Sequence, residues 1–166
     1  MTAPHGFSYD EAFSRNLGWV TVDEQARLKR SRVCIAGLGG VGGVYLLTLA
    51  RMGVGAFSIA EFDTYALANL NRQVGATLSS LGRPKIEVML ELARDINPEL
   101  DVRVFDQGLN AANLDAFLAD GDLYLDGLDF FALAIRRQVF ALCERLRIPA
   151  VTIAPLGMGA SLLNFV

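Results

Sequence analysis

The chain has 166 residues, of which 52% are hydrophobic, 20% are charged and 16 are glycine. This length favours a single domain, and so apolar a composition with a net charge of -3 excludes a disordered chain. The isoelectric point of about 5.1 does not favour a nucleic-acid-binding surface. The mean hydropathy of +0.35 indicates either a sheet that is buried on both faces or a large apolar surface that meets a partner.

The only uncharged run long enough for a membrane span covers residues 33–50, and glycines interrupt its first half. Each glycine would destabilise a continuous helix by about 1 kcal/mol, so a strand, a glycine turn and a helix fit this run better. The N-terminus, up to Arg15, lacks the apolar centre of a signal peptide, and we therefore expect a cytoplasmic protein without a membrane segment.

The two cysteines, Cys34 and Cys143, lie in apolar patterns and form no Cys-x-x-Cys pair. We therefore expect buried structural thiols, with no zinc site and no redox pair. The one histidine, His5, lies in the N-terminal arm, where we expect no catalytic role for it.

Taken in chain order, the sequence predicts an irregular arm over residues 1–20 and then alternating helices and strands over residues 21–166. Thr21 and Glu24 form a capping box that opens a helix ending near Arg30. Strands are expected at 32–36, 56–61, 101–105, 122–126, 149–154 and 160–166. Helices are expected after the glycine turn up to residue 51, at 84–96, at 110–119 with Asn110 as the cap, and around 135–146.

This alternation predicts an α/β fold of the Rossmann-like kind, in which a doubly wound, mostly parallel sheet has helices on both faces. Ligands bind such sheets at the carboxyl ends of the strands. The residues to consider for function are therefore those that follow strands, at 37–43, 61–72 and 126–130.

The first of these segments contains Gly37, Gly39, Gly40 and Gly42 and matches the pattern G-x-G-x-x-G between a strand and a helix. Its glycines would let the backbone approach a phosphate, which the free N–H groups and the helix dipole would bind. Glu61 ends the next strand and could accept a hydrogen bond from a ribose hydroxyl. NAD, FAD, S-adenosylmethionine and ATP all suit such a turn, and glycines needed only for tight packing are the alternative.

The segment from 62 to 85 is long for a connection and carries amides and cations, notably Asn69, Asn71, Arg72 and Lys85. Two cations near a phosphate-binding turn suit a triphosphate, although an ordinary solvated loop would also carry such groups. After the fourth strand, Asp126 and Asp129 could hold Mg²⁺. We expect Asp126 to be structural and Asp129 to face the ligand. Arg136 and Arg137 indicate a solvated helix face.

With these residues the sequence resembles the ThiF/MoeB/HesA family, bacterial relatives of the ubiquitin-activating enzymes. The resemblance extends from Arg15 to about Phe165. It rests on the doubled Gly39-Gly40, Asp63, the run Asn69-Leu70-Asn71-Arg72-Gln73, Gly82-x-Pro84-Lys85, Asn97-Pro98 and Asp126-x-x-Asp129.

The resemblance implies an enzyme that binds ATP and Mg²⁺ and adenylates the C-terminal glycine of a ubiquitin-like or sulfur-carrier protein, releasing pyrophosphate. It places Asp129 at the Mg²⁺ and implies a homodimer in which Arg15 acts in trans, which makes the arm at 1–20 a dimer contact. The expected nucleotide-binding residues are Gly37, Gly39, Gly40, Gly42, Glu61, Asp63, Asn69, Asn71, Arg72 and Lys85.

The sequence departs from the family pattern at several points. Glu61 stands where the family has Asp, and Phe130 follows Asp129 where the family has Asn. A thioester cysteine and the family's zinc-binding Cys-x-x-Cys pairs are not found, and relatives extend beyond Val166, so we expect a chain truncated at its C-terminus.

Three other functions remain open at this point. The same adenylation could act on a small carboxylate on tRNA or on a peptide. An NAD-dependent oxidoreductase would rest on the glycine turn and Glu61 alone. A non-catalytic nucleotide-binding module that recruits a partner would bind ATP without transferring anything.

Overall fold

A six-stranded sheet forms the centre of the computed structural model, which describes residues 6–166. The strands are β1 (Arg32–Ala36), β2 (Ala56–Ala60), β3 (Asp101–Phe105), β4 (Leu123–Asp126), β5 (Ala150–Leu156) and β6 (Gly159–Phe165). They lie in the order β3-β2-β1-β4-β5-β6; neighbouring strands from β3 to β5 run parallel, and β6 pairs antiparallel with β5 at the edge. The strand order reverses between β1 and β4, and this is the point at which doubly wound sheets bind ligands.

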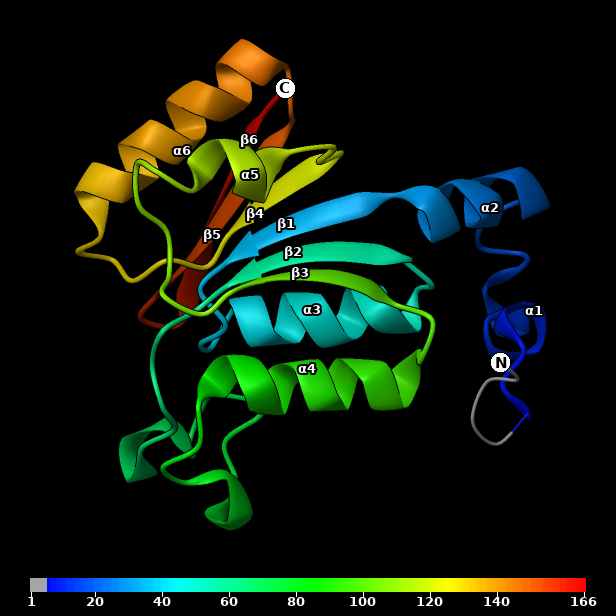
Figure 1. Cartoon of the computed structure of the whole chain (residues 1–166), viewed down its shortest axis with the longest axis horizontal. Helices are drawn as coiled ribbons and strands as arrows, with labels where there is room; N and C mark the ends of the chain where they lie inside the picture. Colours follow the sequence, from blue (N-terminus) through cyan, green and yellow to red (C-terminus); the bar gives the residue numbers. More distant parts are fainter. Residues whose placement is uncertain (1–5) are drawn as a thin grey trace.

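Helices cover both faces of the sheet, with α3 (Gly42–Arg51) and α4 (Lys85–Ile96) on one side and α5 (Leu114–Leu118) and α6 (Leu133–Leu146) on the other (Figure 1). Each face has its own core, one around Ile35, Leu46 and Met89 and the other around Phe117, Tyr124 and Val139. The predicted fold class is therefore confirmed.

The remaining helices precede the sheet or lie in loops. They are α1 (Tyr9–Ala12) and α2 (Val22–Arg30), with the short 3-10 helices η2 (Ser14–Asn16), η3 (Leu67–Asn69) and η4 (Leu78–Ser80).

Local sequence signals account for several of these elements. All five residues of β1 and all five of β2 are buried, as expected of central strands covered on both faces. The predicted capping box is present at the start of α2, where Thr21 N donates to Glu24 Oε2 (2.8 Å) and Glu24 N donates to Thr21 Oγ1 (3.2 Å). Residues 33–50 form most of β1, the glycine turn and most of α3, and no helix within residues 6–166 is long and apolar enough to cross a bilayer.

The segment before Thr21 is more ordered than predicted. Instead of an irregular stretch, it contains α1 and η2, which pack against the C-terminal end of α3. The Tyr9 hydroxyl donates to the Gly53 carbonyl (2.5 Å), and Asn16 Nδ2 donates to the Met52 carbonyl (3.0 Å). The first five residues of the predicted arm, including His5, lie outside the described part of the chain.

The predicted start of α5 is wrong. Asn110 does not cap this helix, which begins at Leu114 after Asn113. The two asparagines instead build a turn, in which Asn113 Oδ1 accepts from Asn110 N (2.8 Å) and Asn110 Oδ1 accepts from Ala112 N (2.9 Å). Asparagine favours such turns as readily as helix starts, because its side chain bonds the backbone two residues on.

Both thiols are buried, as predicted, in the core between the sheet and the helices α5 and α6. Burial raises the pKa of Cys34 to about 11 and the pKa of Cys143 to about 12, so that neither forms the reactive thiolate near neutral pH.

We expect iodoacetamide at pH 8 to leave both thiols unmodified in the folded protein and to alkylate both in urea. Intact-mass spectrometry measures this difference, and rapid alkylation of the folded protein would contradict the assignment of both cysteines as structural.

Candidate active site

The turn between β1 and α3 presents unpaired backbone N–H groups at the carboxyl edge of the sheet. Within the described chain, the amides of Gly39, Gly40 and Val41 donate no hydrogen bond to a protein acceptor. They precede the ten-residue helix α3, whose dipole adds positive potential at the same place. This arrangement can bind an anion, and phosphate is the ligand that such turns bind in Rossmann-like folds.

The four glycines of the turn differ in what requires them. Gly37 has a φ of +81°, and a Cβ built on it would lie 2.2 Å from the Gly127 carbonyl oxygen. A Cβ on Gly42 would lie 1.8 Å from the Gly37 carbonyl oxygen. At Gly39 and Gly40 the nearest protein atom would lie 3.6 Å away, which is an ordinary contact. The protein packing therefore requires glycine at 37 and 42, whereas at 39 and 40 it leaves room for a Cβ.

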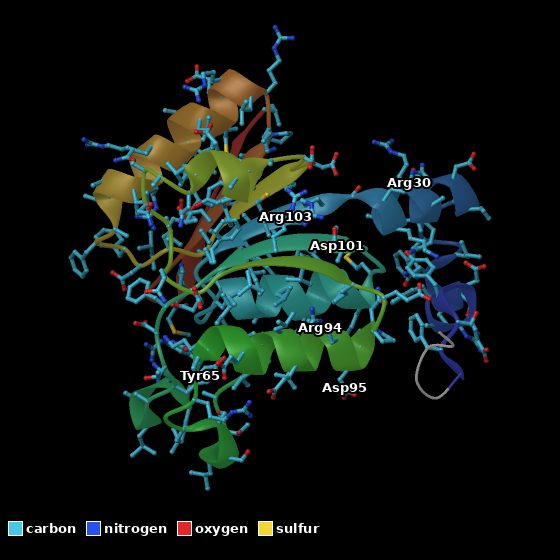
Figure 2. The ribbon with its side chains drawn as sticks, in the orientation of Figure 1. Arg30, Tyr65, Arg94, Asp95, Asp101 and Arg103 are labelled. Carbon is cyan, nitrogen blue, oxygen red and sulfur yellow. The ribbon has the colours of Figure 1, made fainter. Side chains whose placement is uncertain are left out.

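The long segment between β2 and α4 is an ordered loop whose two ends are bonded to each other. Tyr65 N donates to the Arg83 carbonyl (3.0 Å), Gly82 N donates to the Tyr65 carbonyl (2.8 Å), and Lys85 N donates to the Asp63 carbonyl (2.9 Å). Figure 2 shows Tyr65 near the first turn of α4, at the base of this loop. These bonds fix the direction in which the loop leaves the sheet.

The middle of this loop lies against the glycine turn. A Cβ on Gly40 would contact the Arg72 backbone and side chain, and a Cβ on Gly39 would lie 3.6 Å from Gln73 Nε2. Gln73 is buried, and its Oε1 has no hydrogen-bond partner among the described residues. A buried amide oxygen without a partner is costly, which indicates that a ligand or a water donates to it. We did not predict Gln73 as a site residue, although it belongs to the motif that carried the resemblance.

The predicted phosphate-binding side chains occupy this loop and the start of α4. Arg72 is exposed, and its Nη1 donates to the Ala68 carbonyl (2.8 Å) and to Asn71 Oδ1 (3.1 Å). Asn69 is buried, and its carbonyl accepts from the amides of both Arg72 and Gln73. Asn69 thus shapes the turn that carries Arg72.

Lys85, the first residue of α4, is also buried, and its Nζ forms an ion pair with Asp63 Oδ2 (3.0 Å).

Glu61 connects the end of β2 to the glycine turn. One carboxylate oxygen accepts from Leu38 N (2.9 Å), and the other accepts from Phe62 N (2.9 Å) and Asp63 N (3.0 Å). A carboxylate has about four acceptor positions, so one remains for a ribose hydroxyl. The sequence predicted only the contact with ribose and missed this structural role.

The two carboxylates after β4 have different environments. Asp126 is buried and accepts from Arg136 Nε (2.8 Å) and Thr152 Oγ1 (2.8 Å), which agrees with the structural role expected of it. Asp129 is exposed, and one of its carboxylate oxygens accepts from Phe131 N (3.0 Å). The expectation for Arg136 was wrong, because its guanidinium pairs with a buried carboxylate instead of lying on a solvated helix face.

Arg15 does not join the other predicted site residues in this chain. It is exposed on η2, beside the C-terminal end of α3, whereas the glycine turn lies at the N-terminal end. The length of α3 alone separates these two places by about 15 Å. Figure 1 likewise shows the N-terminal elements at the opposite end of the sheet from the strands' carboxyl ends.

The comparisons with known proteins bear on this site. The ThiF family model matches residues 13–166, which include the glycine turn, the β2–α4 loop and both carboxylates. The chain belongs to the ThiF family. The resemblance inferred from the sequence motifs is therefore confirmed.

Several relatives are similar over most of this chain. The chain is 37% identical over 143 residues to the molybdopterin-synthase adenylyltransferase of Escherichia coli, covering 86% of this chain and 57% of the relative. It is 32% identical over 151 residues to a tRNA threonylcarbamoyladenosine dehydratase of Haemophilus influenzae, covering 90% of this chain and 57% of the relative. The E. coli dehydratase TcdA in complex with ATP superposes with a TM-score of 0.81 at 29% identity, covering 92% of this chain and 61% of that one. The chain thus spans little more than half the length of these relatives.

Gly42 and Gly40 differ in how closely the protein packs around them, and the free energy of unfolding of their alanine variants tests this difference. We expect Gly42→Ala to destabilise the protein by about 1–3 kcal/mol or more, because its Cβ would overlap a backbone carbonyl. Gly40→Ala should change the free energy of unfolding by no more than about 0.5 kcal/mol, because its Cβ meets only ordinary contacts. Urea denaturation measures both, and equal losses would show that packing alone explains the glycines.

Proposed function

We propose that this chain is the nucleotide-binding part of an enzyme that uses ATP to adenylate a carboxylate. The observation that carries the proposal is that the Arg72 segment of the β2–α4 loop lies beside the glycine turn, whose amides donate no hydrogen bond to a protein acceptor among the described residues. Family membership supports ATP as the nucleotide, since TcdA, a protein of the same fold, is described in complexes with ATP and with AMP.

The described residues fit a nucleotide in a definite arrangement. The amides of Gly39 and Gly40 would bind phosphate oxygens, and the remaining acceptor position of Glu61 would bind the ribose. The Gln73 side-chain amide lies at the same turn, and its Oε1 would accept a hydrogen bond from the bound ligand or from an ordered water. Gly37 and Gly42 would contribute by letting the turn form.

In the proposed reaction a carboxylate oxygen attacks the α-phosphorus of ATP, the bond to the bridging oxygen breaks, and pyrophosphate leaves. No general base is needed, because the carboxylate is already ionised at neutral pH. Negative charge builds up on the phosphate oxygens, and Arg72 and Lys85 would neutralise it. Lys85 is held by Asp63, so its ammonium is positioned before a nucleotide binds. Asn69 and Asn71 would order the loop that carries Arg72.

Mg²⁺ fits this site only as an ion shared with the nucleotide. No group of three or more metal-binding side chains occurs in the part of the chain that the structure describes. The Asp126 carboxylate already accepts from Arg136 and Thr152, whereas Asp129 is exposed and one of its carboxylate oxygens accepts no hydrogen bond from residues 6–166. Mg²⁺ often binds one carboxylate together with phosphates and water, and when bound it would neutralise the phosphate charge. Asp129 would hold it.

The position of Arg15 supports a homodimer in which this arginine completes the partner's site. Arg15 is exposed and lies too far from the glycine turn of its own chain to contact a nucleotide there. Trp19, which is 93% exposed, lies in the same arm, and Val22, which is 70% exposed, begins α2 directly after it. Large exposed apolar side chains of this kind favour a contact with another protein surface. The arm at residues 1–20 would then lie at the dimer interface.

We propose the C-terminal glycine of a ubiquitin-like or sulfur-carrier protein as the carboxylate. A relative 34% identical to this chain is the sulfur carrier protein ThiS adenylyltransferase of E. coli. A carboxylate on tRNA is the second candidate, because dehydratases that act on tRNA are similar in both sequence and structure. The net charge of -3 argues against tRNA, since affinity for a nucleic acid depends strongly on cationic side chains.

Exchange of labelled pyrophosphate into ATP tests the proposal. We expect exchange that requires a carboxylate substrate, and a loss of about 100-fold or more in Arg72→Ala and in Lys85→Ala, because each removes a cation that stabilises the phosphates. Arg94→Ala is the matched control, since Arg94 is exposed toward the other end of α4 (Figure 2) and should leave exchange unchanged.

The same exchange assay, together with direct binding of ATP and of NADH, separates the alternatives. Stimulation by a sulfur-carrier protein but not by tRNA favours the first substrate, and the reverse result favours the second. Binding of ATP without any exchange would instead indicate a non-catalytic module. Tight binding of NADH without binding of ATP would indicate an oxidoreductase and would overturn the proposal.

A further inference from the structure

The carboxyl end of β4 carries a buried ion pair that the proposed reaction does not use. Asp126 is only 2% exposed, and its carboxylate accepts from Arg136 Nε (2.8 Å) and from Thr152 Oγ1 (2.8 Å). Tyr124 and Leu128 N donate to it as well, at 3.3 and 3.2 Å. A buried carboxylate needs such partners, so Asp126 fixes where the Arg136 guanidinium lies.

The rest of that guanidinium binds the loop between β4 and α6. Its Nη2 donates to the carbonyls of Leu128 (2.8 Å) and Asp129 (3.0 Å), and its Nη1 donates to the carbonyl of Phe130 (3.2 Å). Three consecutive carbonyls are thus held by one side chain that is itself tied to Asp126. Lysine could not make this set of bonds, because it lacks the planar fork of donors.

Asp129 lies in the middle of the loop that Arg136 holds. One oxygen of its carboxylate accepts from Phe131 N (3.0 Å), and its carbonyl also accepts from Ala132 N (3.0 Å). The other carboxylate oxygen is free of protein hydrogen bonds among the described residues. The loop continues into Phe130 and Phe131, which are exposed, so few apolar contacts hold it in place.

We propose that Arg136 is a positioning residue that holds Asp129 for the magnesium–nucleotide complex. This inference rests on the proposed function, in which Asp129 is the side chain that contacts the ion. Residues that orient a metal ligand through hydrogen bonds commonly change metal affinity about 10–100-fold when they are replaced. Arg136 would orient Asp129 through its hydrogen bonds to the backbone of the loop, and it would contact neither the nucleotide nor the metal.

Arg136→Lys tests the proposal, with Arg137→Lys as the matched control on the exposed face of the same helix. We expect Arg136→Lys to raise the Mg²⁺ concentration needed for half-maximal tightening of ATP binding by at least about tenfold, measured by titration calorimetry. Its affinity for ATP in EDTA should stay within about twofold of that of the unmodified protein. Amide hydrogen exchange should accelerate at residues 127–132 and not in α3 or α4.

Arg137→Lys should match the unmodified protein in every measurement. A folded Arg136→Lys variant with unchanged Mg²⁺ dependence and unchanged exchange overturns the inference, whatever the reaction. If the unmodified protein binds no ATP, the proposed function fails and hydrogen exchange alone decides whether Arg136 holds the loop. If Arg136→Lys does not fold, exchange in the unmodified protein decides, since fast exchange of the Phe131 and Ala132 amides would show that the loop is not held.

Discussion

The close approach of backbone to backbone at Gly37, Gly42 and Gly127 determines the geometry of the whole candidate site. A side chain on Gly37 would overlap the Gly127 carbonyl, and a side chain on Gly42 would overlap the Gly37 carbonyl. Gly127 N also donates to the Ala36 carbonyl (2.8 Å), which continues the pairing with β1 one residue past the end of β4. This contact brings the turn after β1 and the loop after β4 together, so that free amides and the Asp129 loop lie at one edge of the sheet.

The β2–α4 loop adds the cations to this edge. Its base is closed by backbone hydrogen bonds between the segments at Asp63–Tyr65 and Gly82–Lys85, and its middle rests on Gly39 and Gly40. Bulky residues at these two glycines would displace Arg72 and Gln73 from the turn. The absence of side chains at Gly39 and Gly40 therefore leaves room for a phosphate, and it also lets Arg72, which would neutralise the phosphate charge, lie beside the turn.

Much of the fold could be predicted because its signals are local. Short runs of mostly apolar residues predict β1 and β2, and Thr21 with Glu24 predicts the start of α2. The start of α5 was mispredicted because asparagine favours turns and helix caps for the same reason, and only the surrounding chain decides between them.

The site residues that escaped prediction are those whose role depends on tertiary contacts. Arg136 and Arg137 are neighbours with the same chemistry, and only the packing of α6 over the end of β4 directs one of them to Asp126. A signal was available, because an aspartate at the end of a buried strand needs a cation or several donors nearby. Similarly, Glu61 was recognised by its place after β2, but its bond to Leu38 N depends on the curvature of the glycine turn.

If the free amides of the glycine turn bind the phosphates of ATP, a methyl group added at Gly40 should weaken that binding without disturbing the fold. Calorimetric titration of ATP into the unmodified protein and into Gly40→Ala separates the effect on the ligand from the effect on the fold, because the added Cβ makes only ordinary contacts with the protein. We expect ATP binding to be at least about tenfold weaker in Gly40→Ala, which is about 1.4 kcal/mol of binding free energy, with unchanged thermal stability. Equal ATP affinity in the two proteins would contradict it.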